Sequence, residues 1–317
     1  HRRARRMGRR SVARACVPWS ARVSRGALLY GFLLPIVLLY AVFSLYPILE
    51  SFRLSFYRMI LTLPWLGQKF VGWENYRDLI TDPVALGSLS TSVIFVAVTT
   101  PIEVLLGLAM ALVLNESFRG RGWLRAIVLI PWAVPTVVTS QMWRFIFNDR
   151  YGVFNYLLFG DATQLYWAPL AEPGLALMSI MVADIWKTSA FAALIILAGL
   201  QGIPGELYEA ASIDGASAWR KFRHITLPMV KPALLLALLF RTIDALKVFD
   251  LVFVMTQGGP ADTTNLLQFY GYKKSFAEGM IGYGSAIAVV VFLLSFFLSV
   301  LYIRLLGTGL LRKAQQT

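Results

Sequence analysis

Six long apolar runs, separated by shorter polar stretches, dominate the pattern of hydrophobic and polar positions along this 317-residue chain. A helix needs about 20 mostly apolar residues to cross the hydrocarbon core of a bilayer. We therefore predict six transmembrane helices, at residues 27–49, 85–114, 124–146, 174–200, 232–256 and 282–306. A closed membrane barrel would instead show weakly alternating segments of about ten residues, which unbroken runs of this length exclude.

The composition also indicates a chain that is embedded in lipid. Hydrophobic residues make up 57% of the sequence and charged residues only 15%, too few charges for the surface of a globular domain. The predicted fold class is an all-α integral membrane protein, with one membrane domain at 26–310 between a basic tail, 1–25, and a short C-terminal tail, 311–317. Cys16 is the only cysteine, which excludes an internal disulfide and a cysteine-built metal site.

The distribution of lysine and arginine predicts the orientation of the chain. Nineteen of these residues fall in or beside the N-terminal tail, the second and fourth connections and the C-terminal end, against eight on the other side. By the positive-inside rule both termini are cytoplasmic. The net charge of +13 then reflects an orientation signal that touches anionic membrane lipids, and nucleic acid is not an expected partner.

Three of the predicted spans carry features that a lipid-facing helix does not tolerate. Pro131 and Pro135 remove backbone donors and should kink or widen the third span. Asp184 and Lys187, spaced i,i+3 in the fourth span, are expected to pair with each other, and Glu103 in the second span is expected to reach a wet seam. Buried charges of this kind must face protein or water.

The one mixed-charge stretch between long apolar runs is residues 203–231. An Ala/Glu-rich piece after Pro204 and a basic piece that ends at Pro228 both have helical patterns, and Gly215 separates them. The sequence therefore predicts a helical hairpin on the cytoplasmic side. Two interpretations remain open: an amphipathic hairpin that lies on the membrane surface, or a plug that fits a groove on a soluble protein.

The same stretch contains "EAA", three residues, glycine, nine residues and then "ITLP". This spacing resembles the signature of the permease subunits of binding-protein-dependent ABC importers. The resemblance covers roughly residues 26–306 and includes "FVGWENY" (70–76), "PWAVPTVVTSQMWRFIFN" (131–148), "YGVFN" (151–155), "LAGLQGIPGELYEAASIDGA" (197–216) and "FDLVFVMTQGGP" (249–260). Within the carbohydrate branch, the chain is most similar to actinobacterial disaccharide permeases, in particular those that recycle trehalose in mycobacteria.

The resemblance implies a type I importer permease in the bacterial plasma (inner) membrane. Its implied partners are a second permease in a heterodimer, two ATPase subunits and an extracytoplasmic sugar-binding (lipo)protein, and its implied substrate is trehalose. The ATPase-coupling residues that it implies are Glu209, Ala210, Ala211, Asp214, Gly215, Ile225, Leu227 and Pro228. The sequence has no GxxxxGK[ST] loop, so we expect no catalysis and no cofactor in this chain, with ATP and Mg²⁺ bound by the ATPase.

Candidate residues for the sugar pathway lie in the fifth span: Arg241, Asp244, Lys247, Phe249 and Asp250. On a continuous helix from Pro232, at about 1.5 Å per residue, Asp244 and Lys247 lie about 18 and 22 Å into the span. That depth suits an occluded sugar site built from planar polar groups and aromatic faces. The charges also alternate in sign at i,i+3, so mutual ion pairing is an equally weighted alternative.

Other functions are less compatible with the sequence. A secondary transporter should show inverted repeats, and none is found. A membrane enzyme should show a catalytic constellation, yet the only histidines are His1 and His224, and neither HExxH nor GxSxG occurs. Within the importer class, another oligosaccharide, a polyol or glycerol phosphate remains an alternative substrate.

Overall fold

A computed structural model describes residues 25–160 and 167–314 of the chain. The chain divides into two units, 1–50 and 51–317. The predicted basic tail lies outside the described residues except for Arg25. At the other end the last helix continues to Ala314, past the predicted start of the C-terminal tail at residue 311.

The described part of the first unit, from Arg25 onward, is one continuous helical segment. Helix α1 (Arg25–Tyr40) passes through a π-helical turn, η2 (Ala41–Leu45), into α2 (Tyr46–Leu54), whose last residues belong to the second unit. Residues Leu33–Leu54 are long and apolar enough to cross a membrane, and none of that stretch is buried. Large apolar side chains such as Phe43, 74% exposed, therefore have lipid as their natural solvent.

In its described residues the second unit is mostly helical, which confirms the all-α membrane fold. Its strands β1 (Tyr57–Arg58) and β2 (Lys69–Phe70) form a short antiparallel ladder. Its helices are η3 (Pro64–Leu66), α3 (Glu74–Thr81), α4 (Pro83–Asn115), α5 (Arg121–Ala133), α6 (Thr136–Ile146), α7 (Val153–Phe159), α8 (Pro173–Gln201), α9 (Gly205–Ile213), α10 (Ala218–Lys221), η4 (Phe222–Thr226), α11 (Leu227–Leu246), α12 (Asp250–Met255), α13 (Leu267–Tyr272), η5 (Lys273–Ala277) and α14 (Ile281–Ala314).

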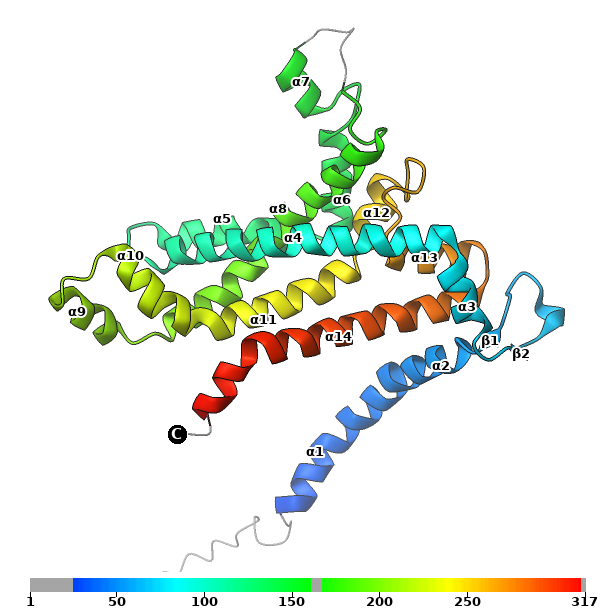
Figure 1. Cartoon of the computed structure of the whole chain (residues 1–317), viewed down its shortest axis with the longest axis horizontal. Coiled ribbons are helices and arrows are strands. Elements are labelled where there is room, and N and C mark those ends of the chain that lie inside the picture. Colours follow the sequence, from blue (N-terminus) through cyan, green and yellow to red (C-terminus); the bar gives the residue numbers. More distant parts are fainter. Residues whose placement is uncertain (1–24, 161–166, 315–317) are drawn as a thin grey trace, which may run out of the picture. The chain divides into compact units, whose positions relative to one another are not determined.

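Helices α4, α8 and α11 pack on one another to form the centre of the second unit. Small residues let them approach closely: a Cβ on Gly107 of α4 would lie 2.7 Å from Ala192 Cβ of α8, and one on Gly199 of α8 only 2.4 Å from Ala233 Cβ of α11. Membrane helices commonly associate through such small side chains. In Figure 1, α4, α11 and α14 run side by side, with α9 and α10 at one end and the β-ladder and α3 at the other.

The predicted third span is broken rather than kinked. Helices α5 and α6 meet at an angle of 89°. Val134 and Pro135, between them, both have extended backbone, with ψ of 133° and 139°. A residue before proline is disfavoured in the helical region, and Pro135 has no N–H with which to continue the helix. Pro131 lies inside α5 without ending it, so Pro135 marks the break.

The predicted fifth span, 232–256, is also interrupted. Helix α11 ends at Leu246, and α12 begins at Asp250 after a short turn. No proline or glycine lies at this break. Phe249 instead packs on Phe253, Phe269 and Tyr272, with ring-centroid distances of 5.3, 6.0 and 4.7 Å. Tertiary packing of this aromatic cluster thus overrides the apolar pattern that predicted one continuous helix.

In the described residues, four helices are long and apolar enough to cross a membrane, or up to five if α5 and α6 form one bent span. The four are Leu33–Leu54, Pro83–Asn115, Pro173–Gln201 and Ile281–Arg304. They agree with the first, second, fourth and sixth predicted spans. The fifth predicted span differs because α11 carries buried charge and stops before the end of the apolar run.

Asp82 joins three helices at the end of the second unit that carries the β-ladder. Its Oδ1 accepts the Val84 amide (2.9 Å) and caps α4, while Oδ2 accepts the hydroxyls of Tyr283 (2.9 Å) and Tyr270. Partial burial alone would raise the pKa of Asp82, but hydrogen bonds from the two tyrosines and from backbone amides favour the carboxylate. The resulting pKa lies below the usual aspartate value.

Asp82→Asn should lower the free energy of unfolding by about 1 kcal/mol at neutral pH, because the charge-assisted bonds to tyrosine are lost. In the wild type, this stabilisation is present above the unfolded-state pKa of about 3.9 and is lost as the pH falls through the lower folded-state pKa. Thermal unfolding in lipid nanodiscs measures both effects. Asp78→Asn is the matched control, and an equal effect of both substitutions would contradict the prediction.

Candidate functional site: the coupling hairpin and the charged helix junction

The predicted hairpin is present, and its turn is a regular helix-terminating motif. Helix α9 ends where the Gly215 amide donates to Ser212 O (3.1 Å) and the Ala216 amide to Ala211 O (2.9 Å). This is the hydrogen-bond pattern of a Schellman motif, which needs a left-handed residue after the helix. Gly215 supplies it with φ of +71°. A Cβ at Gly215 would meet nothing within 4 Å, so the backbone conformation rather than a neighbouring atom restricts this position.

Side-chain bonds tie the two arms of the hairpin together. Lys221 Nζ on α10 donates to Ser212 Oγ on α9 (2.6 Å), and Ser212 Oγ donates to the carbonyl of Tyr208 (2.7 Å). Tyr208 Oη lies 2.9 Å from Thr226 Oγ1 in the π-helical turn η4. These bonds join the middle and the C-terminal end of α9 to the second arm, so the hairpin can move as one rigid piece.

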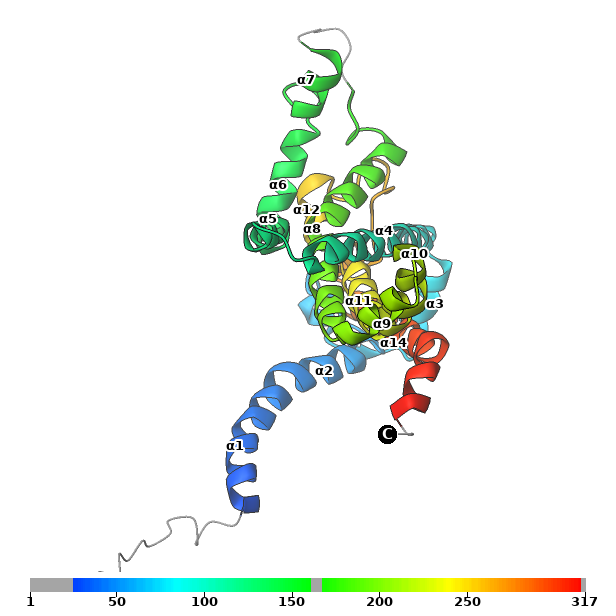
Figure 2. The same ribbon diagram turned by 90° about the vertical axis from the view of Figure 1, so that its left-hand side faces the viewer.

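The hairpin presents exposed apolar groups beside acidic ones. Ile213 is 88% exposed and Trp219 is 68% exposed, and the side chains of Glu209 and Asp214 also face outward. A cleft of about 310 Å³ opens between the arms. Of the predicted coupling residues, Ala211, Asp214 and Ile225 line that cleft, whereas Glu209, Ala210, Gly215, Leu227 and Pro228 are exposed outside it. Figure 2 views the molecule from this end, with α9 and α10 nearest the viewer.

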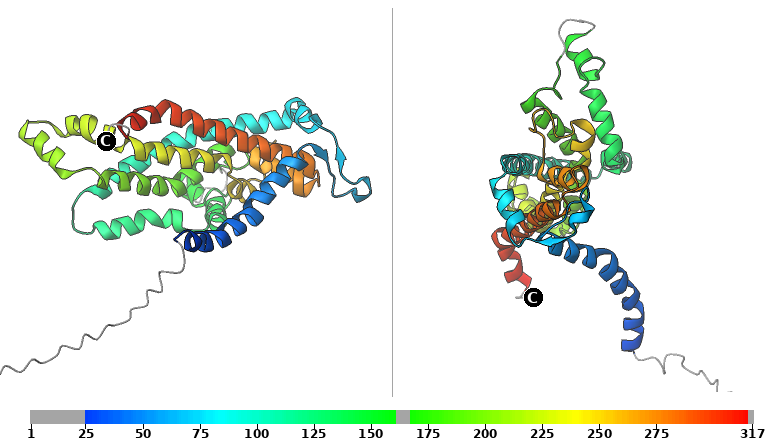
Figure 3. Two further views of the ribbon diagram at one scale, coloured as in Figure 1. Left: turned by 90° about the horizontal axis from the view of Figure 1, so that it is seen from below. Right: turned by 90° about the vertical axis from the view of Figure 1, so that its right-hand side faces the viewer.

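The prediction that Pro228 ends the second helix is wrong. Helix α10 continues through η4 into α11, and Pro228 lies in the first turn of α11. In η4 the Leu227 amide donates to Phe222 O, five residues back. This wider π-type turn makes room for a proline that would otherwise clash with the preceding turn. The second arm of the hairpin is therefore continuous with α11 (Figure 3, left).

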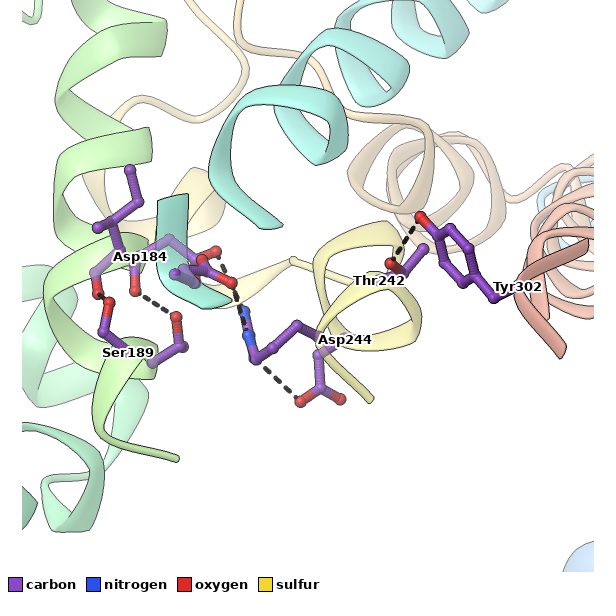
Figure 4. Close-up of polar contacts among 9 residues, drawn as sticks. Asp184, Ser189, Thr242, Asp244 and Tyr302 are labelled. Atoms are coloured by element: carbon purple, nitrogen blue, oxygen red, sulfur yellow. Dashed lines mark hydrogen bonds and ion pairs between the residues drawn. The ribbon is translucent and has the colours of Figure 1, made fainter. Parts of the chain in front are cut away.

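At the far end of α11, Arg241 is buried at 2% exposure and binds three carboxylates from three helices. Its Nε lies 2.7 Å from Glu103 Oε2 on α4, its Nη2 3.5 Å from Asp184 Oδ2 on α8, and its Nη1 3.1 Å from Asp244 Oδ2 one turn along α11. The Asp244 side chain is 55% exposed, but Glu103 and Asp184 are almost fully buried. Asp184 and Asp244, both labelled in Figure 4, contact this guanidinium from α8 and from α11.

Two expectations about the buried charges are wrong. Glu103 does not reach a wet seam: it is 0% exposed and pairs with Arg241 across 138 residues of sequence. Asp184 and Lys187 form no ion pair within 4 Å in the described structure. Lys187 Nζ instead donates to Val134 O, the carbonyl at the break between α5 and α6. Tertiary partners thus replace the local i,i+3 partner.

Two of the remaining pathway candidates, Lys247 and Phe249, lie beside two hollows that share Gln268. Lys247 lines the first, about 400 Å³, together with Ser295 and Ser299. Phe249 lines the second, about 350 Å³, together with Tyr272. Asp250 is only partly buried at the start of α12. Arg241 therefore serves the helix junction, whereas Lys247 and Phe249 border space that a ligand can enter.

Sequence reasoning missed Gln268, Ser295 and Ser299 as lining residues. Nothing in their spacing marked them, because the first hollow forms only where α11, α13 and α14 meet and the second only where α13 and α14 meet. In the described part of the chain, no group of three or more His, Cys, Asp or Glu side chains is placed to hold a metal ion. The polar and aromatic lining suits hydrogen bonding and ring stacking with a small polar ligand.

Comparison with known proteins gives a consistent result. The family model described as "Binding-protein-dependent transport system inner membrane component" matches residues 103–307. The trehalose/maltose transport system permease MalF of Thermococcus litoralis is 41% identical over 87% of this chain and 92% of its own length. The trehalose transport system permease SugA of Mycobacterium tuberculosis is 36% identical, over 91% and 92%. The sulfoquinovosyl glycerol transport system permease SmoG of Agrobacterium fabrum is 38% identical, over 92% and 94%.

A solved structure shares the fold. The chain matches a chain of a bacterial alginate ABC transporter, crystallised with an alginate pentasaccharide-bound periplasmic protein, with a TM-score of 0.75. The identity is 19%, and the match covers 88% of this chain and 94% of the other. At that identity the match concerns the fold alone.

Proposed function

The chain belongs to the family of binding-protein-dependent transport system inner membrane components and is a permease subunit of a carbohydrate ABC importer; we propose that its substrate is trehalose. We further propose that it forms half of the translocation pathway, beside a second permease. Two ATPase subunits, which bind ATP and Mg²⁺, and an extracytoplasmic sugar-binding (lipo)protein complete the assembly. Because the chain belongs to this family, a secondary transporter is no longer an alternative.

The observation that carries the coupling proposal is the shape and continuity of the hairpin. Its arms are bonded to each other, its exposed Ile213 and Trp219 suit burial in a groove, and its second arm runs into α11. The hairpin therefore docks in the ATPase, where Glu209 pairs with a basic residue. Closure of the ATPase moves the hairpin and α11 together, and this movement changes access to the sugar pathway.

Two observations support a neutral disaccharide as the substrate. The hollows beside Lys247 and Phe249 combine hydroxyl, amide and aromatic groups, which suit sugar hydroxyls and ring faces. Two relatives that match over most of this chain are named as permeases for trehalose.

We also propose that both termini lie in the cytoplasm. The hairpin and the β-ladder then lie on opposite sides of the bilayer, since they are at opposite ends of the helices.

One observation favours a second candidate, an anionic sugar derivative such as sulfoquinovosyl glycerol. The side chain of Lys247 borders a hollow and has no carboxylate within 4 Å among the described residues. An unpaired ammonium group there would attract a sulfonate or a phosphate. The relative SmoG is named for such a substrate.

The test is reconstitution of the chain with its partner permease, ATPase and binding protein in liposomes. We expect binding protein loaded with trehalose to stimulate ATP hydrolysis several-fold over unloaded binding protein. Stimulation by sulfoquinovosyl glycerol alone would replace trehalose with the anionic candidate. In that case Lys247→Met should abolish the stimulation, whereas with trehalose it should weaken it only modestly. Failure to assemble with any ATPase would contradict the coupling proposal.

A further inference from the structure

The buried cluster at the junction of α4, α8 and α11 holds more negative than positive charge. Two carboxyl groups, of Glu103 and Asp184, are 0% and 3% exposed by residue and share one guanidinium, that of Arg241. Asp244 also contacts this guanidinium, but its exposed side chain can be compensated by water. A buried ion must be paired, so one of the two inner carboxyl groups lacks a charge partner.

The other charged groups around the cluster do not supply the missing charge. On α8, Lys187 is the next cation, but its Nζ is bound to Val134 O and lies more than 4 Å from any carboxylate in the described structure. On α12, Asp250 adds further negative charge and acts electrostatically on Lys187. From α14, the hydroxyl of Tyr302 is engaged with Thr242, and a hydroxyl cannot supply a positive charge (Figure 4).

One atom in the cluster lacks a hydrogen-bond partner. Glu103 Oε2 is bound to Arg241, but Glu103 Oε1 is fully buried and receives no bond from any described group. The carboxyl groups of Glu103 and Asp184 lie against the same guanidinium, with Glu103 Oε2 2.7 Å from Arg241 Nε and Asp184 Oδ2 3.5 Å from Arg241 Nη2. Two carboxylates are both acceptors and cannot bond, whereas a carboxylic acid donates to a carboxylate.

We propose that Glu103 and Asp184 hold one proton between them, so that the junction carries one buried negative charge opposite Arg241. The proton satisfies Glu103 Oε1, removes the repulsion between the two carboxyl groups and leaves one ion pair with the guanidinium. It also bonds α4 directly to α8. The ligand of this site is a proton, and the site is independent of the sugar that the importer carries.

At alkaline pH the junction should lose the shared proton. Removal of the proton leaves two adjacent buried negative charges for one positive charge, which pushes α4 and α8 apart. Glu103→Gln mimics the protonated acid, because its amide donates a hydrogen bond and does not titrate. The variant should therefore keep the helix junction at neutral pH and lose its sensitivity to alkali.

The direct measurement is infrared difference spectroscopy of the assembled importer in lipid at neutral pH. The wild type should show the C=O stretching band of a protonated carboxylic acid. The band should vanish in Glu103→Gln and in Asp184→Asn, because the remaining carboxylate is then paired with Arg241. Asp244→Asn is the matched control, because it removes a carboxylate from the same arginine and should leave the band in place. Absence of the band in the wild type, or its survival in both inner variants, would overturn the proposal.

A second measurement, the pH dependence of thermal unfolding, tests the proposal if a substitution alters assembly of the importer. The midpoint of thermal unfolding of the wild-type importer should fall by several degrees from neutral to alkaline pH, and that of Glu103→Gln should stay level. Equal pH dependence in the two proteins would overturn the proposal. A neutral-pH stability that requires sodium or potassium, measured against choline at equal ionic strength, would also overturn it, since a metal cation would then occupy the site.

Discussion

Replacement of Gly215 by valine should lower sugar uptake at least tenfold while leaving membrane insertion unchanged. The turn needs φ of +71°, and only glycine adopts this region freely. The left-handed conformation costs an ordinary residue about 1–2 kcal/mol and a β-branched residue more. Since about 1.4 kcal/mol corresponds to a factor of ten, the Schellman turn becomes a minor conformation and the hairpin no longer fits its groove.

Two substitutions separate backbone strain from added bulk. Gly215→Asn should retain most of the uptake, because asparagine tolerates the left-handed region. Gly205→Val is the matched control: Gly205 begins α9 on the same hairpin, has an ordinary φ, and a Cβ there also meets nothing within 4 Å. The measurement is uptake of radiolabelled trehalose into proteoliposomes at equal protein content. Wild-type uptake by Gly215→Val would rule out the coupling role of the turn.

The hairpin was predictable because its determinants are local in sequence. The helix-forming piece, the glycine and the second helical piece are consecutive, and a left-handed glycine after a helix is a common termination signal. The error at Pro228 also has a local cause. Proline usually ends a helix, and nothing in the sequence of residues 222–226 showed that a π-type turn would accommodate it.

The interruptions of the spans were predictable to different degrees. Pro131 and Pro135 correctly indicated a disturbance of the third span, although the structure has a full break at Pro135. The break after Leu246 carries no proline or glycine and arises from the packing of Phe249 among distant aromatic rings. Hydrophobic patterning records how apolar a segment is, and it does not record which neighbours will bend it.

The ion pairs of the charged junction could not be assigned from spacing. Local pairing correctly predicted the contact of Arg241 with Asp244, three residues apart. The shorter contact of Arg241 joins it to Glu103 on another helix, and only the packing of α4 against α11 brings the two together. The cost of charge in a membrane predicts that such residues face protein or water, and Arg241 does face protein, but this cost does not identify its partners.

Replacement of Arg241 by methionine should reduce stability by about 3–5 kcal/mol, the usual cost of leaving a buried ionic partner uncompensated. Glu103 and Asp184 would then share the junction with no cation in contact, and α4, α8 and α11 would lose their common partner. Arg241→Lys should rescue this loss only weakly, because an ammonium group cannot reproduce the planar contacts of a guanidinium with several carboxylates. Thermal unfolding in nanodiscs and the yield of assembled importer measure the effect.

The decisive comparison is a triple variant. Adding Glu103→Gln and Asp184→Asn to Arg241→Met removes the two inner charges together with their partner, and a neutral junction of similar volume is tolerated far better than a broken ion pair. The triple variant should therefore recover most of the lost stability, whereas Glu103→Gln with Asp184→Asn alone should not, because Arg241 then keeps only the half-exposed Asp244. If the triple variant is no more stable than Arg241→Met, charge compensation is not what Arg241 contributes. If it is stable but cannot transport sugar, the charged junction is needed for the movement of α11 as well as for its position.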